Sequence, residues 1–147
     1  MTEQRDVSKI TVRREITASA EELFDAWLDA DGLAQWMRPL DCTHATAKVT
    51  ATVGGPFEIV MHSRSQGPVL HRGVYKVIDR PRRLVFTWNS PSTHHIETLV
   101  TVDFRSAKPG MTEVVITQER LPDAEAEQNH TQGWSDILKV LSQTRLS

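Results

Sequence analysis

Apolar and polar residues alternate along most of the middle of the chain, which is the pattern of β-strands with one buried face. Between residues 45 and 53, small apolar residues alternate with threonine and lysine. Similar stretches recur up to residue 120, with glycine- and proline-containing turns between them. Together with a segment near the N-terminus, they predict strands over residues 10–16, 45–53, 57–63, 70–78, 83–88, 97–105 and 112–120.

Two short helices are expected between the first and second strands. Ser19 stands three residues before Glu22, the arrangement of a capping box, ahead of an apolar stripe that includes Trp27. We expect this helix to end at residues 29–32, and a second short helix to cover residues 33–37.

A long helix is expected at the C-terminal end. Asp123 is a suitable N-cap residue, and the residues after it repeat apolar positions at the spacing of one helix face. That face carries Trp134, Ile137, Leu138 and Leu141. Gly133 interrupts the helix beside Trp134, although a helical glycine costs about 1 kcal/mol relative to alanine.

The order strand, two helices, six strands and long helix predicts the α+β class. Short turns between successive strands imply antiparallel pairing. A single sheet can surround one helix only by curling, which the natural twist of strands permits. We therefore expect a curved antiparallel sheet of six to seven strands wrapped around the C-terminal helix. No repeat or linker divides residues 1–147, so we expect one domain with its core over about residues 10–143.

Charge and cysteine content narrow the function classes. A formal net charge of −2 gives no electrostatic basis for binding nucleic acid or an anionic membrane. No apolar segment has the length of a signal peptide or a membrane span. The single cysteine, Cys42, excludes an internal disulfide and suits a reducing compartment. We expect a cytoplasmic protein with no nucleic-acid or membrane partner, and a homodimer is an open option for a domain of this size.

The ordered set of segments resembles a known family. It consists of ITASAEELFDAWLDADGLAQWM, Gly54-Gly55, GVYKVIDRPRRLVFTW and a final GWSDILKVL, with Trp36, Trp88 and Gly133-Trp134 in matching places. This set is similar to that of the activator of heat-shock-protein-ninety ATPase homologue-like family, in the START-like (SRPBCC) helix-grip superfamily. The resemblance extends from about Ile10 to Leu141.

The resemblance implies a cavity between the curved sheet and the last helix, which often receives apolar ligands in this superfamily. We expect this protein to bind a small apolar or aromatic ligand there, with no cofactor, metal ion or dedicated catalytic residues. The expected lining residues are Trp36, Met61, Tyr75, Trp88, His130 and Trp134. Their indole N–H groups and the tyrosine hydroxyl would orient the ligand.

Gly133 has two interpretations in such a fold. It would let the helix approach a strand closely, which we expect, or it would leave a gap at the mouth of the cavity. The same helix face carries His130, whose pKa near neutrality would suit a polar anchor, although a lone histidine near a helix start is more often a boundary residue.

Two other functions stay open. An enzyme such as a cyclase or hydrolase could use the same cavity, with His130, Tyr75 or Arg14 as acid–base groups. A co-chaperone is the third option, but the founding co-chaperones of the family carry a separate N-terminal domain that touches the chaperone. Only about ten residues precede the first expected strand here, so we expect no chaperone interaction.

Arg14 falls on the apolar side of the first strand, where a buried charge requires a partner. Glu58, Glu97 or Glu119 on other strands could supply it. We expect an internal ion pair, with a ligand carboxylate as the alternative partner.

Other histidines and the cysteine offer weaker chemistry. A hairpin centred on residues 66–67 would place His62 opposite His71, close enough to share a metal ion, but zinc sites usually use three or four protein ligands. We expect two exposed histidines at the hairpin tip instead. Cys42 and His44 could face the same side of a strand, but spacing alone does not show the lowered thiol pKa that a nucleophile needs. The histidine pair at residues 94–95 lies in a loop, and the sequence supplies no further ligands for a metal ion there.

Overall fold

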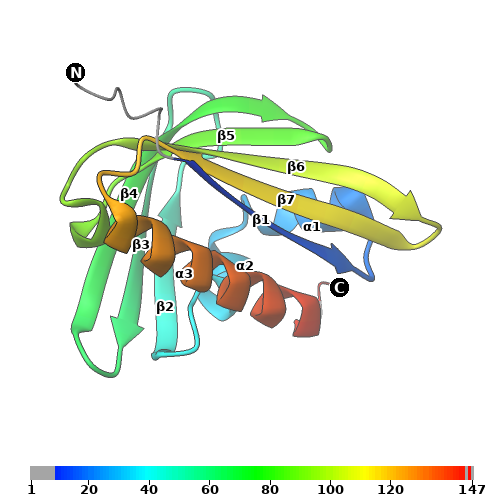
Figure 1. The fold of residues 1–147 in the computed structure, drawn as a ribbon. Coiled ribbons are helices and arrows are strands. Elements are labelled where there is room, and N and C mark those ends of the chain that lie inside the picture. Colours follow the sequence, from blue (N-terminus) through cyan, green and yellow to red (C-terminus); the bar gives the residue numbers. More distant parts are fainter. Residues whose placement is uncertain (1–8, 145, 147) are drawn as a thin grey trace, which may run out of the picture.

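The computed structural model describes residues 9–144 and residue 146. In this part of the chain the strands and α-helices follow the predicted order (Figure 1). The strands are β1 Lys9–Ile16, β2 Cys42–Val49, β3 Pro56–Ser63, β4 Gly67–Asp79, β5 Arg83–Trp88, β6 Thr98–Lys108 and β7 Met111–Glu119. The helices are α1 Ala20–Ala26, α2 Ala30–Trp36 and α3 Ala124–Gln143, with a 3-10 turn, η1, at Pro91–Thr93.

The seven strands form one antiparallel sheet, as their short connections predict. The strand order is β1-β7-β6-β5-β4-β3-β2, so the first two strands of the chain form the two edges. The sheet curls, and α3 crosses its concave side (Figure 1). The expected α+β helix-grip architecture is confirmed. None of the described helices is long and apolar enough to cross a membrane.

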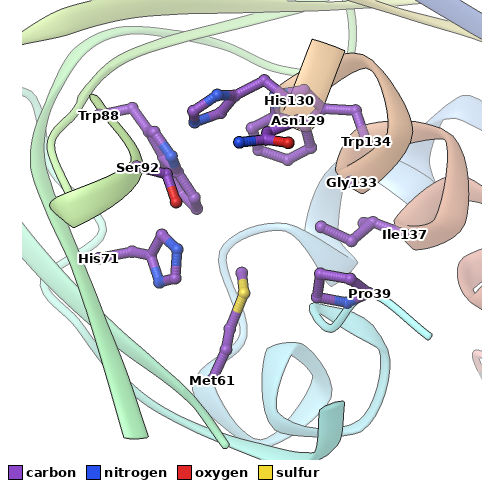
Figure 2. A pocket seen from close by; sticks show the side chains of 10 residues that line it. All are labelled: Pro39, Met61, His71, Trp88, Ser92, Asn129, His130, Gly133, Trp134 and Ile137. Atoms are coloured by element: carbon purple, nitrogen blue, oxygen red, sulfur yellow. The ribbon is translucent and has the colours of Figure 1, made fainter. Parts of the chain in front are cut away.

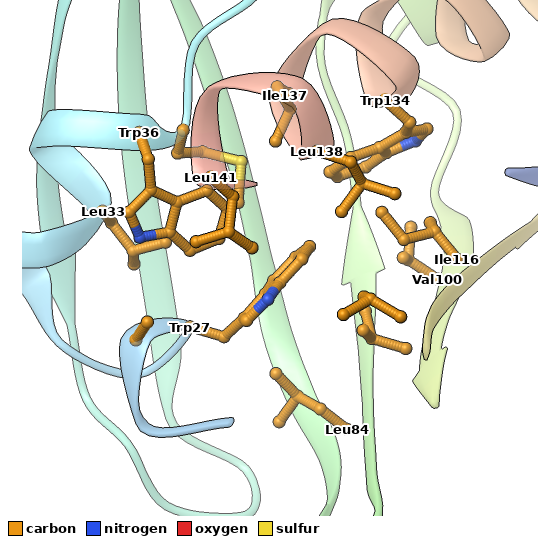
Figure 3. Close-up of a cluster of buried hydrophobic side chains, with 14 of the residues drawn as sticks. Trp27, Leu33, Trp36, Leu84, Val100, Ile116, Trp134, Ile137, Leu138 and Leu141 are labelled. Carbon is orange, nitrogen blue, oxygen red and sulfur yellow. The ribbon is translucent and has the colours of Figure 1, made fainter. Parts of the chain in front are cut away.

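The apolar face of α3 fills the concave side of the sheet. Trp134, Ile137, Leu138 and Leu141 are each 3% exposed or less. They pack with side chains from the two short helices and the central strands (Figure 3). Burial of one such side chain contributes about 1.5–3 kcal/mol, so this face is what holds α3 against the sheet.

The helices start where capping residues stand, with one correction to the prediction. Ser19 Oγ accepts a hydrogen bond from the Glu22 backbone N–H at 3.1 Å, and the Glu22 carboxylate accepts one from Ser19 N at 3.2 Å. These bonds complete the expected capping box, and Asp123 caps α3 as expected. Asp29 begins α2 rather than ending α1, because its carboxylate accepts the backbone N–H of Gly32 and so favours a new helix start.

Two expectations at the sheet edges are wrong. The second strand ends at Val49 rather than at residue 53, because the chain turns at Thr50 and leaves Val53 66% exposed. Arg14 is exposed on the edge strand β1. Its charge remains in water and needs no buried glutamate, so the expected internal ion pair is not formed.

Gly73 lies where β4 changes its main pairing partner from β3 to β5. Up to Val74, β4 pairs with β3, and from Tyr75 onward it pairs with β5. A β-carbon built at Gly73 would lie 1.8 Å from the Thr87 carbonyl oxygen. Only glycine allows the two backbones to come this close.

Gly133 has the opposite environment. A β-carbon at this position would meet no atom within 4 Å. The close approach that we expected from the sequence is therefore wrong, and the alternative, a gap beside α3, describes the structure.

We predict that Gly73→Ala destabilises the protein by about 3 kcal/mol or more, because backbone atoms of β5 would have to move. Gly133→Ala is the matched control, and it should stabilise the protein by up to about 1 kcal/mol through helix propensity. Denaturant unfolding of the two variants measures both changes. Similar changes in the two variants would contradict the role given to Gly73.

Candidate functional site

A pocket opens between the first half of α3 and the strands β3, β4 and β5. Its volume is about 100 Å³. Figure 2 shows the side chains arranged around the open space. The lining residues are Pro39, Met61, His71, Trp88, Ser92, Asn129, His130, Gly133, Trp134 and Ile137.

Strand and helix periodicity bring these side chains together. Met61 lies on the inner face of β3, and His71 is directed inward from β4. His130, Trp134 and Ile137 are three or four residues apart on α3 and so share one helix face. Gly133 lies on the same helix beside these residues, and the open space next to it forms part of the pocket.

Two indole rings form the apolar wall. The ring of Trp134 lies 5.0 Å from the ring of Trp88, centroid to centroid, and the ring of His71 also lies 5.0 Å from that of Trp88. Aromatic contacts at these distances stabilise a fixed arrangement. The pocket therefore presents flat, rigid surfaces to a ligand.

A buried hydrogen-bond chain fixes the indole of Trp134. Trp134 Nε1 donates to Gln118 Oε1 at 2.8 Å, and Gln118 Nε2 donates to Thr98 Oγ1 at 3.0 Å. Thr98 Oγ1 in turn donates to the Trp88 carbonyl oxygen at 2.6 Å. Gln118 is completely buried, so this chain satisfies groups that would otherwise be costly to bury. The Trp134 N–H, which we expected to orient a ligand, therefore already donates its hydrogen bond to Gln118.

His71 and His130 face the pocket and are each 8% exposed. Burial lowers the pKa of His71 to about 4, with the charge of His130 a smaller cause in the same direction. Burial also lowers the pKa of His130, and its hydrogen bond to the Ala126 carbonyl opposes this only in part. Both imidazoles are neutral at pH 7.

Four of the six expected lining residues meet at this pocket: Met61, Trp88, His130 and Trp134. Tyr75 lies deeper, beside a space of about 10 Å³ that is roughly the size of one water molecule. Trp36 is fully buried against Trp27. Their expected role in this cavity is not seen, because each is enclosed in the core.

His71 is the lining residue that sequence reasoning placed wrongly. Ile59, not His62, lies opposite His71, and His62 pairs with Pro68. His71 is therefore buried rather than exposed at a hairpin tip. The spacing of His71 and Tyr75, four residues apart on one strand, was the available signal, because such residues share a face. Nothing in the sequence marked Ser92 or Asn129.

The remaining histidines and the cysteine lie outside the pocket. His44 pairs with His62 across β2 and β3, and the two rings stack at 4.0 Å. A register shift separates Cys42 from His44, so Cys42 is buried while His44 is exposed. Burial raises the pKa of the Cys42 thiol, which makes a nucleophilic thiolate less accessible. Within the described residues, no group of three or more potential metal ligands comes together.

The three candidate acid–base groups do not form a catalytic set. His130 lines the pocket, Tyr75 lines the deeper space, and Arg14 lies exposed on β1. Burial raises the pKa of the Tyr75 hydroxyl further above neutrality. A general acid or base must reach the reacting atom, and only His130 is placed to do so.

Three wider hollows elsewhere on the surface have different linings. Their volumes are about 580 Å³ beside the β6–β7 hairpin, about 530 Å³ beside α1 and α2, and about 260 Å³ beside β3, β4 and β5. The second has Glu22, Asp25, Asp29 and Asp31 on its walls. Each of the three has a single aromatic lining residue, whereas the pocket beside α3 combines two indole rings with two buried histidines.

Fold and pocket together define a helix-grip domain with a small aromatic-walled pocket beside its C-terminal helix. Residues 17–145 match the family described as Activator of Hsp90 ATPase homolog 1-like protein. The match covers most of the chain, and the protein belongs to this family. The resemblance seen in the sequence is thereby confirmed. A comparison with curated proteins found no match.

Solved structures from several organisms have the same fold. A protein from Chromobacterium violaceum is 25% identical, with 92% of this chain and 96% of that chain covered and a TM-score of 0.78. An HSP90 activator from Plasmodium falciparum is 23% identical, with coverage of 92% and 94% and a TM-score of 0.74. A Rhodobacter sphaeroides protein is 17% identical, with coverage of 94% and 95% and a TM-score of 0.77.

We predict that His71 makes the fold sensitive to mild acid. In the unfolded chain its pKa is about 6.5, whereas in the folded protein it is about 4. Above pH ~6.5 both states are neutral at this position, and the full stability is present. As the pH falls from about 6.5 to about 4, the unfolded chain binds a proton that the folded protein does not, which costs about 1.4 kcal/mol per pH unit.

Denaturant unfolding at pH 7 and pH 4.5 checks this prediction. His71→Gln removes the titrating group and keeps a polar side chain. The loss of stability on acidification should be smaller in the variant by about 2–3 kcal/mol. Carboxylates and His130 titrate in both proteins, so an equal loss in both would show that His71 is not the responsible group.

Proposed function

We propose that this protein binds a small apolar or aromatic ligand in the pocket between α3 and the sheet. The observation that carries the proposal is the opening beside Gly133, whose walls are the rings of Trp88 and Trp134. Ligand pockets are typically lined by apolar and aromatic side chains with a few polar groups. This pocket has that composition, with His71 and His130 as its buried polar groups.

The size of the pocket limits the ligand. Its volume of about 100 Å³ is below the roughly 300–1,000 Å³ of pockets that hold drug-sized ligands. A single aromatic ring that buries about 150 Å² would gain about 4 kcal/mol before the costs of binding. Without those costs this free energy would correspond to a dissociation constant of about 1 mM, and the costs make binding weaker. Burial alone therefore supports weak binding, and tighter binding requires polar contacts.

We predict that Gly133→Leu abolishes ligand binding, because the added side chain enters the open space at the pocket mouth. Native mass spectrometry of gently purified protein would first show whether a small molecule is retained. Titration of single-ring aromatic compounds, followed by tryptophan fluorescence, would then give affinities. The expected effect of Gly133→Leu is a loss of at least about tenfold, or about 1.4 kcal/mol.

Gln132→Leu is the matched control, because residue 132 is exposed on the other side of the same helix turn. It should leave affinity unchanged. An equal loss in both variants, or no binding by the unmodified protein up to ligand solubility, would argue against this pocket as a binding site.

A co-chaperone role is the second candidate. It is favoured by the family match over residues 17–145 and by the shared fold of the Plasmodium falciparum HSP90 activator. Stimulation of an Hsp90 ATPase by the protein would support this role. Stimulation that persists in Gly133→Leu would assign it to a surface separate from the pocket, whereas no stimulation would leave ligand binding as the better account.

A further inference from the structure

A hydrogen bond fixes the tautomer of His130. Its Nδ1 lies 2.7 Å from the Ala126 carbonyl oxygen. A carbonyl oxygen can only accept, so Nδ1 carries the hydrogen, and Nε2 of the neutral ring carries a lone pair and acts as an acceptor. The ring of His71 has two backbone partners instead, Val69 and Ile59.

Nε2 of His130 is open to the pocket. Within the described residues its ring forms one hydrogen bond, from Nδ1 to Ala126. The side-chain nitrogens that are both fully enclosed and unpaired are the indole nitrogens of Trp27, Trp36 and Trp88. Nε2 of His130 is not among them, and the ring of His130 borders the open space (Figure 2).

The rest of the lining favours a neutral ligand. Besides the two histidines, its polar side chains are those of Ser92 and Asn129, and none of the lining residues is acidic or carries Lys or Arg. A charged molecule would lose its hydration without gaining an ionic partner, which is costly. A neutral molecule that donates one hydrogen bond would instead find an acceptor, Nε2 of His130.

We propose that the pocket selects a neutral aromatic molecule that bears a hydrogen-bond donor, such as a phenolic hydroxyl, and that this donor bonds to Nε2 of His130. The inference rests on the proposed function, and it names the chemical class of that ligand. The aromatic ring would lie against the wall formed by Trp88 and Trp134, whose own rings are in contact, and the donor would point to His130. The hydrogen bond supplies the affinity that burial of a single ring does not.

The test compares 4-fluorophenol with 4-fluorotoluene by fluorine NMR titration of the full chain. The two probes have nearly the same shape, but only the phenol donates a hydrogen bond. Burial alone favours the more apolar toluene, because a buried hydroxyl without a partner is costly. We expect the phenol to bind about tenfold more tightly.

The two proposals fail in different ways. If the toluene binds as tightly as the phenol or more tightly, the inferred donor contact is overturned while ligand binding in the pocket stands. If neither probe binds up to its solubility limit, the proposed function fails and the inference fails with it. Both results come from the unmodified protein and do not depend on a variant that folds.

A variant then tests the acceptor. His130→Leu removes Nε2 and should abolish the preference for the phenol while toluene binding remains. His44→Leu, at an exposed position on β2, is the control and should keep the preference. A preference that survives in His130→Leu would overturn the assignment.

Discussion

The burial of Trp134 is the contact on which the rest of the structure depends. Its ring lies 6.1 Å from that of Trp27 and 5.0 Å from that of Trp88, and its N–H donates to Gln118. One side chain thus joins α3 to α1, β5 and β7. A ring held on three sides fixes the rotation of the helix about its axis. That rotation places the two residues that shape the pocket, Gly133 and His130, one and four positions away along α3.

Two glycines near the pocket act in opposite ways. Gly73 lets the backbones of β4 and β5 approach closely where β4 changes its partner from β3 to β5. Gly133 leaves unfilled space on α3 where another residue would extend into the concavity. Close packing removes most voids from protein interiors, so an opening with aromatic walls at this point is informative about function.

Burial, rather than a neighbouring charge, is the main cause of the lowered pKa of both pocket histidines. Burial keeps His71 and His130 neutral, and His130 leaves its Nε2 without a partner among the described residues. The indole of Trp134, by contrast, is paired internally with Gln118. Under the proposed function, a pocket of this kind would distinguish neutral donors from apolar and charged molecules, because each alternative leaves a buried group without its partner.

The sequence by itself determined the strands, the capping of α1 and α3 by Ser19 and Asp123, and the apolar face of α3, because these depend on periodicity and on local hydrogen bonds. That was enough for the helix-grip fold and for most of the pocket wall. Only the tertiary structure decided that Ile59 faces His71 and that Gly133 borders open space. A period of two defines the faces of a strand but not its register against a neighbour, and the space beside a glycine depends on side chains from distant parts of the chain.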